Sequence, residues 1–382
     1  MLENKKTIII FSCFYEPFMS GAERFVKEIS ERLSRPQRQQ ANLHGGQAAR
    51  YRFVIVSARI DKNLPVKVEK NGIEIHRVGF GNKFDKWLYP ILSPFVALKY
   101  KPALLHAVME SYAGIALWIS SFLTKTPRIL TLQSGDLDDA TKQNKIPRWL
   151  WKKIHTTPTA ITAISNFLKK RALDLGVPEE KITIIPNGVD FSEINSLKES
   201  EKVPHRIICV GRLSWEKGHE YLFGAMPEIL KQFPDARLVL AGAGSREGEL
   251  KDLANGLRIS QAIDFLGNLP HNRVLEEIKK SSVFICPSLA EGLGIVFIEA
   301  QACGVPVIGT RIGGIPDVIE NGVNGLLILP RNSKAIFDAI KGILDDASMA
   351  SNLTQNALES VKKFDWYKIA EDMENVYNKN VL

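Results

Sequence analysis

Short runs rich in Ile and Val alternate with longer segments of helical periodicity along nearly the whole sequence. In segment 21–34, for example, Phe25, Ile29 and Leu33 fall on one stripe of a helix. Strands that alternate with helices are typical of βαβ units, whose parallel strands are buried on both faces. The alternation therefore predicts an α/β protein with doubly wound, Rossmann-like parallel sheets. The predicted strands lie within 6–14, 52–58, 103–109, 128–134, 160–165, 181–190, 205–214, 237–244, 263–270, 283–292, 305–310 and 325–330, and the predicted helices within 21–34, 112–124, 166–176, 219–234, 295–304 and 365–382.

The length of the chain and one polar stretch predict two domains. A chain of 382 residues suits two domains of ~150–200 residues each. Segment 192–204 is polar and ends in Pro, as an exposed linker does, and a second strand–helix series follows it. We therefore expect Rossmann-like domains at 1–195 and 196–365, followed by an amphipathic helix at 366–382. Such folds bind ligands in the crevice at the carboxyl ends of their strands.

Positive charge is concentrated in the first half of the chain. Residues 1–200 contain 30 Lys and Arg against 19 Asp and Glu, whereas the remainder contains 20 against 23. The first half is therefore expected to meet something anionic: a membrane surface, a nucleic acid or a phosphorylated substrate. Segments 84–101 and 145–155 combine Trp with Lys, which suits either an anionic membrane interface or ordinary packing faces with snorkelling lysines. Nucleic-acid binding is disfavoured, because no recognisable module with aromatic platforms is present.

Apolar runs and cysteines bear on location. The longest apolar runs, 87–98 and 112–123, are shorter than the ~18–20 residues that a spanning helix needs. We expect a cytoplasmic protein, free or peripheral on the inner face of the cytoplasmic membrane. No CxxC spacing indicates zinc, and scattered cysteines beside apolar strands are typical of buried, reduced thiols. The cysteines are Cys13, Cys209, Cys286 and Cys303.

Two strand-to-helix loops have the composition of phosphate sites. Arg212 and Lys217 lie between a predicted strand and a predicted helix, where an Arg fork and a Lys point charge together suit a diphosphate. Gly21 occupies the corresponding place in the first half. Its missing side chain permits close backbone approach, and the helix that follows offers free N–H groups to an anion.

Two carboxylates, Glu291 and Glu299, lie eight positions apart in an otherwise apolar segment. Burying an unpaired carboxylate is costly, so each is expected to hold something. A helix would separate them by ~12 Å, which is too far for the paired acids of a glycosidase. The spacing suits one acid on a sugar and the other on a ribose of the same nucleotide-sugar. Between them, the loop Gly292, Leu293 and Gly294 presents backbone N–H groups to charge in the middle.

Five segments together resemble the landmarks of the family 4 glycosyltransferases (glycosyl transferases group 1), in the family's order. The segments are SGAERFV, IIPNGVD, VGRLSWEKG, SLAEGLGIVFIEAQACGVPVIGT and GGIPDVIENGVNGLLI. The resemblance spans essentially the whole chain and is more specific in the second half. It implies the GT-B fold, in which two Rossmann-like domains face a central cleft. It also implies retaining transfer from a nucleotide-diphosphate sugar to a glycan or lipid-linked acceptor, as in cell-envelope polysaccharide or glycolipid synthesis.

The resemblance assigns roles to the matching residues. Arg212 and Lys217 would bind the donor diphosphate and stabilise the leaving nucleotide. Glu291 would bond the donor sugar, Glu299 would bond the ribose hydroxyls, and Gly21 would lend its backbone to the diphosphate. Arg212, Lys217 and Glu291 are thus the predicted catalytic residues. Domain 196–365 would hold the donor and domain 1–195 the acceptor, and helix 366–382 would return to the first domain.

The first domain departs from the family pattern. Many relatives carry a His two residues after His106, where this chain has Val108, and another common His is here Gln133. His106, Gln133 and Asp136 are candidate acceptor contacts, although a buried structural role for His106 is an equal alternative. Asp136 and Asp138 form a D-x-D spacing that binds a metal in another architecture. Here the Arg and Lys loop already supplies positive charge, so an acidic loop near the acceptor is preferred and no cofactor or divalent metal is expected.

Two other functions remain open. A nucleotide-sugar epimerase of the same fold would eliminate and re-add the nucleotide without an acceptor. A non-catalytic nucleotide-sugar-binding relative would fit the missing histidines of the first domain.

Overall fold

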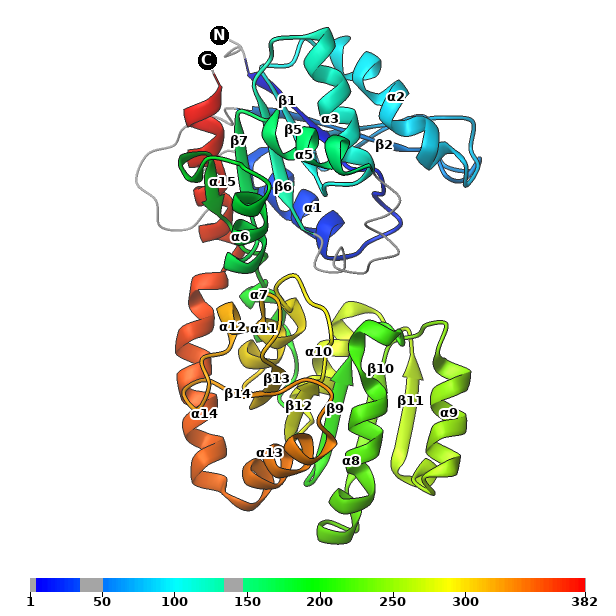
Figure 1. The fold of residues 1–382 in the computed structure, drawn as a ribbon, viewed down its shortest axis with the longest axis vertical. Helices are drawn as coiled ribbons and strands as arrows, with labels where there is room; N and C mark the ends of the chain where they lie inside the picture. The colour runs from blue at the N-terminus through cyan, green and yellow to red at the C-terminus, as the bar shows by residue number, and fades with distance from the viewer. Residues whose placement is uncertain (1–4, 35–50, 134–146, 382) are drawn as a thin grey trace. The chain divides into compact units, whose positions relative to one another are not determined.

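The structure is a computed structural model that describes residues 5–34, 51–133 and 147–381 (Figure 1). Its contacts divide the chain into two compact units, Met1–Asn187 with Trp366–Leu382, and Gly188–Asp365. The division falls eight residues before the 195/196 boundary expected from the sequence. Within the expected linker, Phe191–Ser196 forms helix α7 of the second unit.

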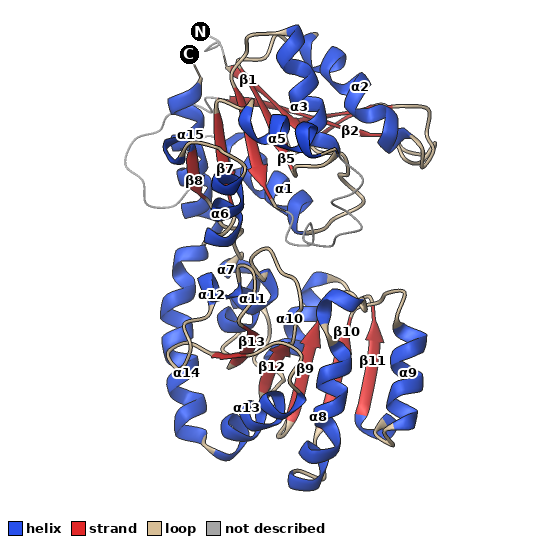
Figure 2. Ribbon diagram, viewed as in Figure 1, coloured by secondary structure: helices blue, strands red, loops and turns tan. Residues whose placement is uncertain are grey.

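The first unit is built on an eight-stranded sheet with the order β3-β4-β2-β1-β5-β6-β7-β8 (Figure 2). All its strand pairs are parallel except β3–β4, which form an antiparallel hairpin at one edge. The parallel strands confirm the predicted α/β class. The strands are β1 (Lys6–Phe11), β2 (Tyr51–Ala58), β3 (Lys67–Lys70), β4 (Ile73–Val78), β5 (Leu104–Val108), β6 (Arg128–Leu132), β7 (Ala160–Ala163) and β8 (Ile182–Ile184).

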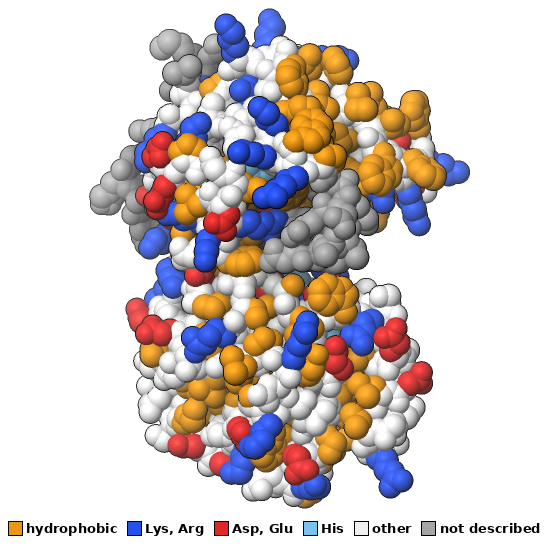
Figure 3. All heavy atoms as spheres, viewed as in Figure 1, with side chains coloured by type: hydrophobic (Ala, Val, Ile, Leu, Met, Phe, Trp, Pro, Cys, Tyr) orange, Lys and Arg blue, Asp and Glu red, His pale blue; other side chains and the backbone are white. Residues whose placement is uncertain are grey.

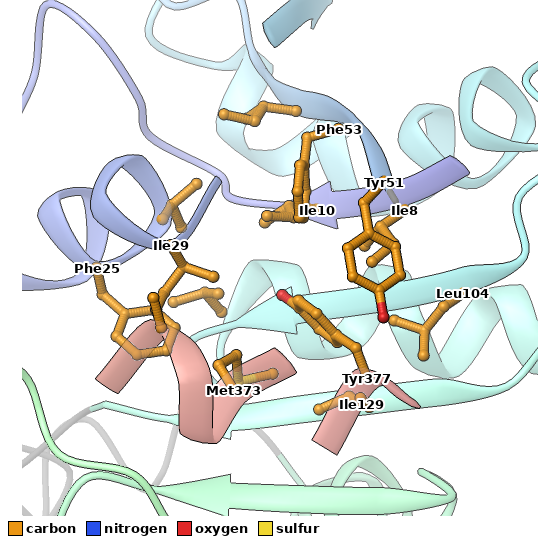
Figure 4. Packing of buried hydrophobic residues seen from close by; sticks show 14 of the residues in the cluster. Ile8, Ile10, Phe25, Ile29, Tyr51, Phe53, Leu104, Ile129, Met373 and Tyr377 are labelled. Carbon is orange, nitrogen blue, oxygen red and sulfur yellow. The ribbon is translucent and has the colours of Figure 1, made fainter. Parts of the chain in front are cut away.

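The helices of the first unit cover this sheet, and the chain's last helix is one of them. Helix α15 packs against α1, with Phe25 and Trp366 in an edge contact at 6.1 Å between ring centroids. Tyr377 and Met373 of α15 lie among Ile8, Phe53 and other core residues of the sheet (Figure 4). The last helix is therefore part of the first unit's core. The helices are α1 (Gly21–Ser34), α2 (Asp85–Leu98), α3 (Tyr112–Leu123), α5 (Arg148–Thr156), α6 (Asn166–Asp174) and α15 (Trp366–Asn380).

The second unit is built on a six-stranded, all-parallel sheet with the order β11-β10-β9-β12-β13-β14. The chain runs outward from β9 to β10 and β11, then returns to place β12 on the other side of β9. Ligands of doubly wound sheets bind where the strand order reverses in this way, outside the carboxyl ends of the strands. The strands are β9 (Arg206–Val210), β10 (Arg237–Ala241), β11 (Ile263–Gly267), β12 (Val283–Cys286), β13 (Val307–Thr310) and β14 (Leu326–Ile328).

Helices connect the strands of the second sheet. Among them, α8 and α11 begin at the ends of the loops that follow β9 and β12. The helices after α7 are α8 (His219–Gln232), α9 (Glu247–Gly256), α10 (His271–Lys279), α11 (Ile295–Ala302), α12 (Ile315–Val318), α13 (Ser333–Asp345) and α14 (Ala347–Ser360). All four cysteines of the chain are buried and free, which confirms the prediction. None of the described helices combines the length and apolar character needed to cross a membrane.

Candidate functional site

The loop after β9 carries the two predicted phosphate-binding cations. A short 3-10 helix, Trp215–Lys217, precedes Gly218, where the backbone has a φ of 64° and α8 begins. A Cβ at Gly218 would come within 2.3 Å of the carbonyl oxygen of Pro287, so only glycine permits this close approach. Gly218 thereby allows the loop after β9 to lie directly against the chain that follows β12.

Lys217 and Glu291 form an ion pair, with 2.6 Å between Nζ and Oε2. Their side chains are 14% and 18% exposed, so the pair is largely shielded but reaches solvent at one side. Burial has the largest influence on the pKa of Lys217 and would lower it, but attraction to Glu291 and Cys286 outweighs burial and raises the pKa. Lys217 is therefore a fixed ammonium beside a carboxylate.

Arg212 lies in the same loop and is oriented by Glu216. Its guanidinium is 3.4 Å from the carboxylate of Glu216, yet the Arg212 side chain remains 67% exposed. Glu216 is itself buried, and its carbonyl oxygen accepts hydrogen bonds from the backbone N–H groups of Leu289 and Ala290. Glu216 thus joins the Arg212 loop to the Glu291 loop. Glu216 was not predicted from the sequence, although it is an acid directly before Lys217 in WEKG.

Two glycines, Gly292 and Gly313, lie against the backbone or the carboxylate of Glu291. Gly313 has a φ of 51°, and a Cβ there would come within 2.0 Å of the carbonyl oxygen of Glu291. The N–H of Gly292 donates to the Glu291 carboxylate at 3.2 Å. The side chain of Leu293 is buried. Gly294 then caps the start of α11.

Glu299 lies on α11 and belongs to a second charged group. Its side chain is only 8% exposed, and its Oε1 is 2.8 Å from Nε2 of His271. The Nδ1 of His271 is 2.9 Å from a carboxylate oxygen of Glu193, on α7. His271, the first residue of α10, therefore bridges two carboxylates and fixes the position of Glu299. His271 and Glu193 were missed, because they lie 28 and 106 positions before Glu299 and only the fold brings them together.

His219, at the start of α8, adds no positive charge to this site. It is 1% exposed, and burial, together with the nearby Lys217 and Arg246, lowers its pKa to about 4. The ring is therefore neutral at neutral pH. Arg212 and Lys217 both lie in the loop after β9, next to the chain that follows β12, where the strand order reverses.

In the first unit, Gly21 is the first residue of α1, next to a capping box. The backbone N–H of Ser20 donates to the Glu23 carboxylate at 2.8 Å, and the Ser20 hydroxyl also donates to it. Glu23 is buried, so a negative charge already occupies part of this helix N-terminus. The backbone of Gly21 remains half exposed.

His106 is fully buried in the first unit, which disfavours a contact with an acceptor. Its side chain is 0% exposed, with Nδ1 2.8 Å from the Tyr377 hydroxyl and Nε2 2.6 Å from the Thr131 hydroxyl. Burial lowers the pKa of His106 to about 3. The structure favours the structural alternative, because this neutral histidine fastens α15 to the first sheet.

Gln133 lies just after β6, and its amide is engaged by Asn187. The two side chains exchange reciprocal hydrogen bonds at 3.0 and 2.9 Å. The backbone N–H of Gln133 donates to Glu110, a buried carboxylate that was not predicted from the sequence. Gln133 would have to release Asn187 before it could bond an acceptor. Asp136 and Asp138 lie outside the described residues.

The sequence matches two family models that adjoin each other. Residues 19–193 match the model described as Glycosyltransferase Family 4, and residues 191–360 match the model described as Glycosyl transferases group 1. An uncharacterized glycosyltransferase of Methanocaldococcus jannaschii is 33% identical over 231 residues, which are 57% of this chain and 59% of that relative. The Homo sapiens relative, one component of phosphatidylinositol N-acetylglucosaminyltransferase, is 27% identical, with 97% of this chain and 76% of that relative covered.

Two solved structures share the fold. Sucrose-phosphate synthase from Thermosynechococcus elongatus superimposes with a TM-score of 0.80 at 21% identity, covering 98% of this chain and 99% of that one. Anabaena HepE in complex with UDP-glucose gives 0.76 at 19% identity, covering 98% and 99%. These likenesses confirm the predicted pair of Rossmann-like domains of the GT-B type. The two adjoining matches and the shared fold place the chain among the glycosyltransferases, as a member of group 1 with a family 4 N-terminal half.

Proposed function

We propose that the protein transfers a sugar, with retention of configuration, from a nucleoside-diphosphate sugar to a lipid-linked or glycan acceptor. The observation that carries the proposal is the pairing of Lys217 with Glu291 beside the exposed guanidinium of Arg212. Two cations at the reversal point of a parallel sheet suit the diphosphate of a nucleotide. A carboxylate next to these cations can accept hydrogen bonds from the hydroxyl groups of the sugar that the diphosphate carries.

The donor class is supported by the chemistry of the second unit. Arg212 presents donors to solvent, and Lys217 is held as an ammonium by Glu291, so both oppose the negative charge of a diphosphate. HepE, which shares the fold, was crystallised with UDP and with UDP-glucose. Glu299 is positioned by His271 to accept hydrogen bonds from a ribose. A UDP-sugar is therefore the first donor to test.

In the proposed reaction, the positive charge of the site acts on the leaving group. The bond between the anomeric carbon and the diphosphate oxygen breaks, and the acceptor oxygen bonds to the same face of that carbon. The acceptor's proton passes to the departing diphosphate, which carries away the electron pair of the broken bond. Arg212 and Lys217 stabilise the growing negative charge on the diphosphate, and the step requires no divalent metal.

Relatives guide the choice of acceptor. The human relative is named for phosphatidylinositol N-acetylglucosaminyltransferase, and a Corynebacterium glutamicum relative is named a mannosyltransferase acting on a phosphatidylinositol monomannoside. Another, from Mycobacterium tuberculosis, is named glycogen synthase. A lipid-linked acceptor at the cytoplasmic face of a membrane fits the first two names and the basic first half of the chain. A soluble glycan is the second class to test.

The proposal is tested in two stages. A thermal-shift panel of UDP-, GDP- and ADP-sugars should show one nucleotide raising the melting temperature of the wild type and not of Arg212→Ala, because a ligand bound only to the folded state stabilises it. Lys334→Ala, an exposed cation elsewhere in the second unit, is the matched control. The selected donor is then incubated with EDTA, with and without candidate acceptors. An epimerised sugar formed without acceptor, or an absolute requirement for added metal, would contradict the proposal.

A further inference from the structure

Three helices of the first unit present large apolar side chains to solvent. Helix α2 contacts α3, and α3 contacts α5. In Figure 3, hydrophobic side chains gather over the part of the first unit where Figure 1 shows α2 and α3. We call this surface the aromatic face and define it by Phe84, Trp87, Ile91, Phe95, Phe122 and Trp149, all of which are exposed.

Ring contacts link the three helices of the aromatic face in pairs. The rings of Trp87 on α2 and Tyr112 on α3 meet edge to face, with 5.3 Å between centroids. Trp118 of α3 lies 5.1 Å from the Phe122 ring and 6.1 Å from the Trp149 ring on α5. One ring contact thus links α2 to α3, and a second group of rings links α3 to α5.

Helix α2 carries the centre of this surface on one stripe. Trp87, Ile91 and Phe95 follow one another at intervals of four residues and are 59%, 54% and 53% exposed. The opposite side of α2, with Tyr89 and Ala97, is fully buried. The solvent-facing stripe of a surface helix is normally polar, and an extended apolar surface of this kind marks a binding site.

Cations accompany the aromatic face. Within 80–133 and 147–156, the described residues contain nine Lys and Arg but only two carboxylates, Asp85 and Glu110, and both are 0% exposed. Lys86 lies over the ring of Trp87, with Nζ 5.7 Å from its centroid. Exposed lysines flank the face at Lys83 and Lys99, among others. The aspartates of 134–146 lie outside the described residues.

We propose that the aromatic face docks the first unit onto an anionic phospholipid surface. Trp and Phe would enter the interfacial layer, while the lysines would meet the headgroup phosphates. Seven of the nine cations are Lys, whereas interfaces between proteins are enriched in Arg and depleted of Lys. Two copies of this basic surface would repel each other. This inference rests on the proposed function, because docking on a membrane would bring the enzyme to a lipid-linked acceptor. Docking itself requires neither donor nor acceptor.

The test is vesicle flotation with the full chain and no donor. Wild type should float with vesicles that contain phosphatidylglycerol, and weakly with phosphatidylcholine alone. The double variant Trp87→Ser/Phe95→Ser should lose binding on the order of 10-fold. The matched control is Leu329→Ser/Leu358→Ser, which removes exposed apolar side chains from the second unit and should bind as wild type does.

A second pair of variants tests the charge. Lys83→Gln/Lys99→Gln should weaken binding to phosphatidylglycerol vesicles on the order of 10-fold, and added salt should reduce the difference. Lys231→Gln/Lys334→Gln, exposed lysines of the second unit, should leave binding unchanged. Unchanged melting temperatures would show that all four variants are folded.

The inference is overturned if wild type stays in solution with anionic vesicles, or if the Trp87/Phe95 variant binds as tightly as wild type. It is also overturned if light scattering shows a wild-type dimer that this variant disperses, since the face would then be a self-interface. The proposed function and the docking surface can fail independently of each other. If no nucleotide-sugar shifts the melting temperature but vesicles still bind, the donor assignment fails and the docking surface stands.

Discussion

The carboxyl ends of the strands carry different kinds of side chain in the two units. In the second unit they carry charged groups in ion pairs that reach solvent, such as Lys217 with Glu291 and Arg212 with Glu216. In the first unit, Gln133 bonds an amide there, and His106, further back in its strand, bonds two hydroxyl groups in the core. Fixed charges at an accessible edge are suited to binding a charged ligand. The neutral pairs of the first unit mainly hold the fold together.

The two units also differ in the side chains that they expose to solvent. The first unit exposes aromatic rings on α2, α3 and α5 with lysines beside them, whereas His106 in its core is fully buried. This contrast fits the proposed donor site in the second unit and the proposed docking surface in the first.

The largest effect is expected at Lys217. Lys217→Ala removes the ammonium and leaves Glu291 without its partner, so Arg212 alone would stabilise the charge on the departing diphosphate. We expect turnover to fall by about 10²–10³-fold or more in a steady-state transfer assay. Lys231→Ala, an exposed lysine on α8, should remain fully active. A Lys217→Ala enzyme with nearly wild-type turnover would remove the basis for placing catalysis in the second unit.

His106 should affect stability rather than catalysis. His106→Ala leaves the buried hydroxyl of Tyr377 without its partner, removes one of the two hydrogen bonds of the Thr131 hydroxyl, and opens a cavity between α15 and the sheet. We expect a loss of about 2–4 kcal/mol in the free energy of unfolding, measured in urea. Turnover per folded molecule should stay within about twofold, since His106 is sealed from solvent. A large fall in turnover of the folded variant would return His106 to the acceptor site.

Acid should destabilise the protein through buried histidines, among them His106 in the first unit and His219 in the second. The folded pKa is about 3 for His106 and about 4 for His219, below the ordinary value near 6.5. Between those values the unfolded chain binds more protons, so stability is lost as pH falls below about 6.5. By pH 5 the loss is about 2 kcal/mol for each histidine.

Unfolding in urea at pH 7 and pH 5 measures this loss. His106→Gln and His219→Gln should each be less stable than wild type at pH 7 but less sensitive to acid. If either variant shows the full acid sensitivity of the wild type, the corresponding histidine is not the source.

The smallest effect is expected at His271, which positions Glu299. His271→Ala frees the Glu299 carboxylate from its fixed orientation, so the ribose contact should weaken. We expect the donor KM to rise about 10-fold with kcat changed less, because this interaction is made in both ground and transition states. His271→Gln, which can still donate to Glu299, should recover part of the loss. An unchanged KM would indicate that Glu299 is structural.

Some features of this protein are fixed by short stretches of sequence. The alternation of Ile- and Val-rich runs with helical stripes predicted both parallel sheets, because the two periodicities are local properties of the chain. The predicted helix 21–34 begins and ends where α1 does. Arg212 and Lys217 were identifiable because they lie between a strand and a helix, and Glu291 because it is an acid in an otherwise apolar segment. Helix α2 was missed because Pro90 and Pro94 lie inside it, where proline normally removes a hydrogen bond.

Other features were decided only by tertiary structure. Whether His106 faced a ligand or the core depended on α15, whose Tyr377 lies 271 positions away and bonds it. The His271 bridge and the Gln133–Asn187 pair likewise join residues that local patterns cannot connect. The sequence by itself determined which side chains carry charge and which segments become strands, since these depend on residue type and spacing. Partners, burial and exposure depended on which distant segments pack together, and a pattern read along the chain contains no such contacts.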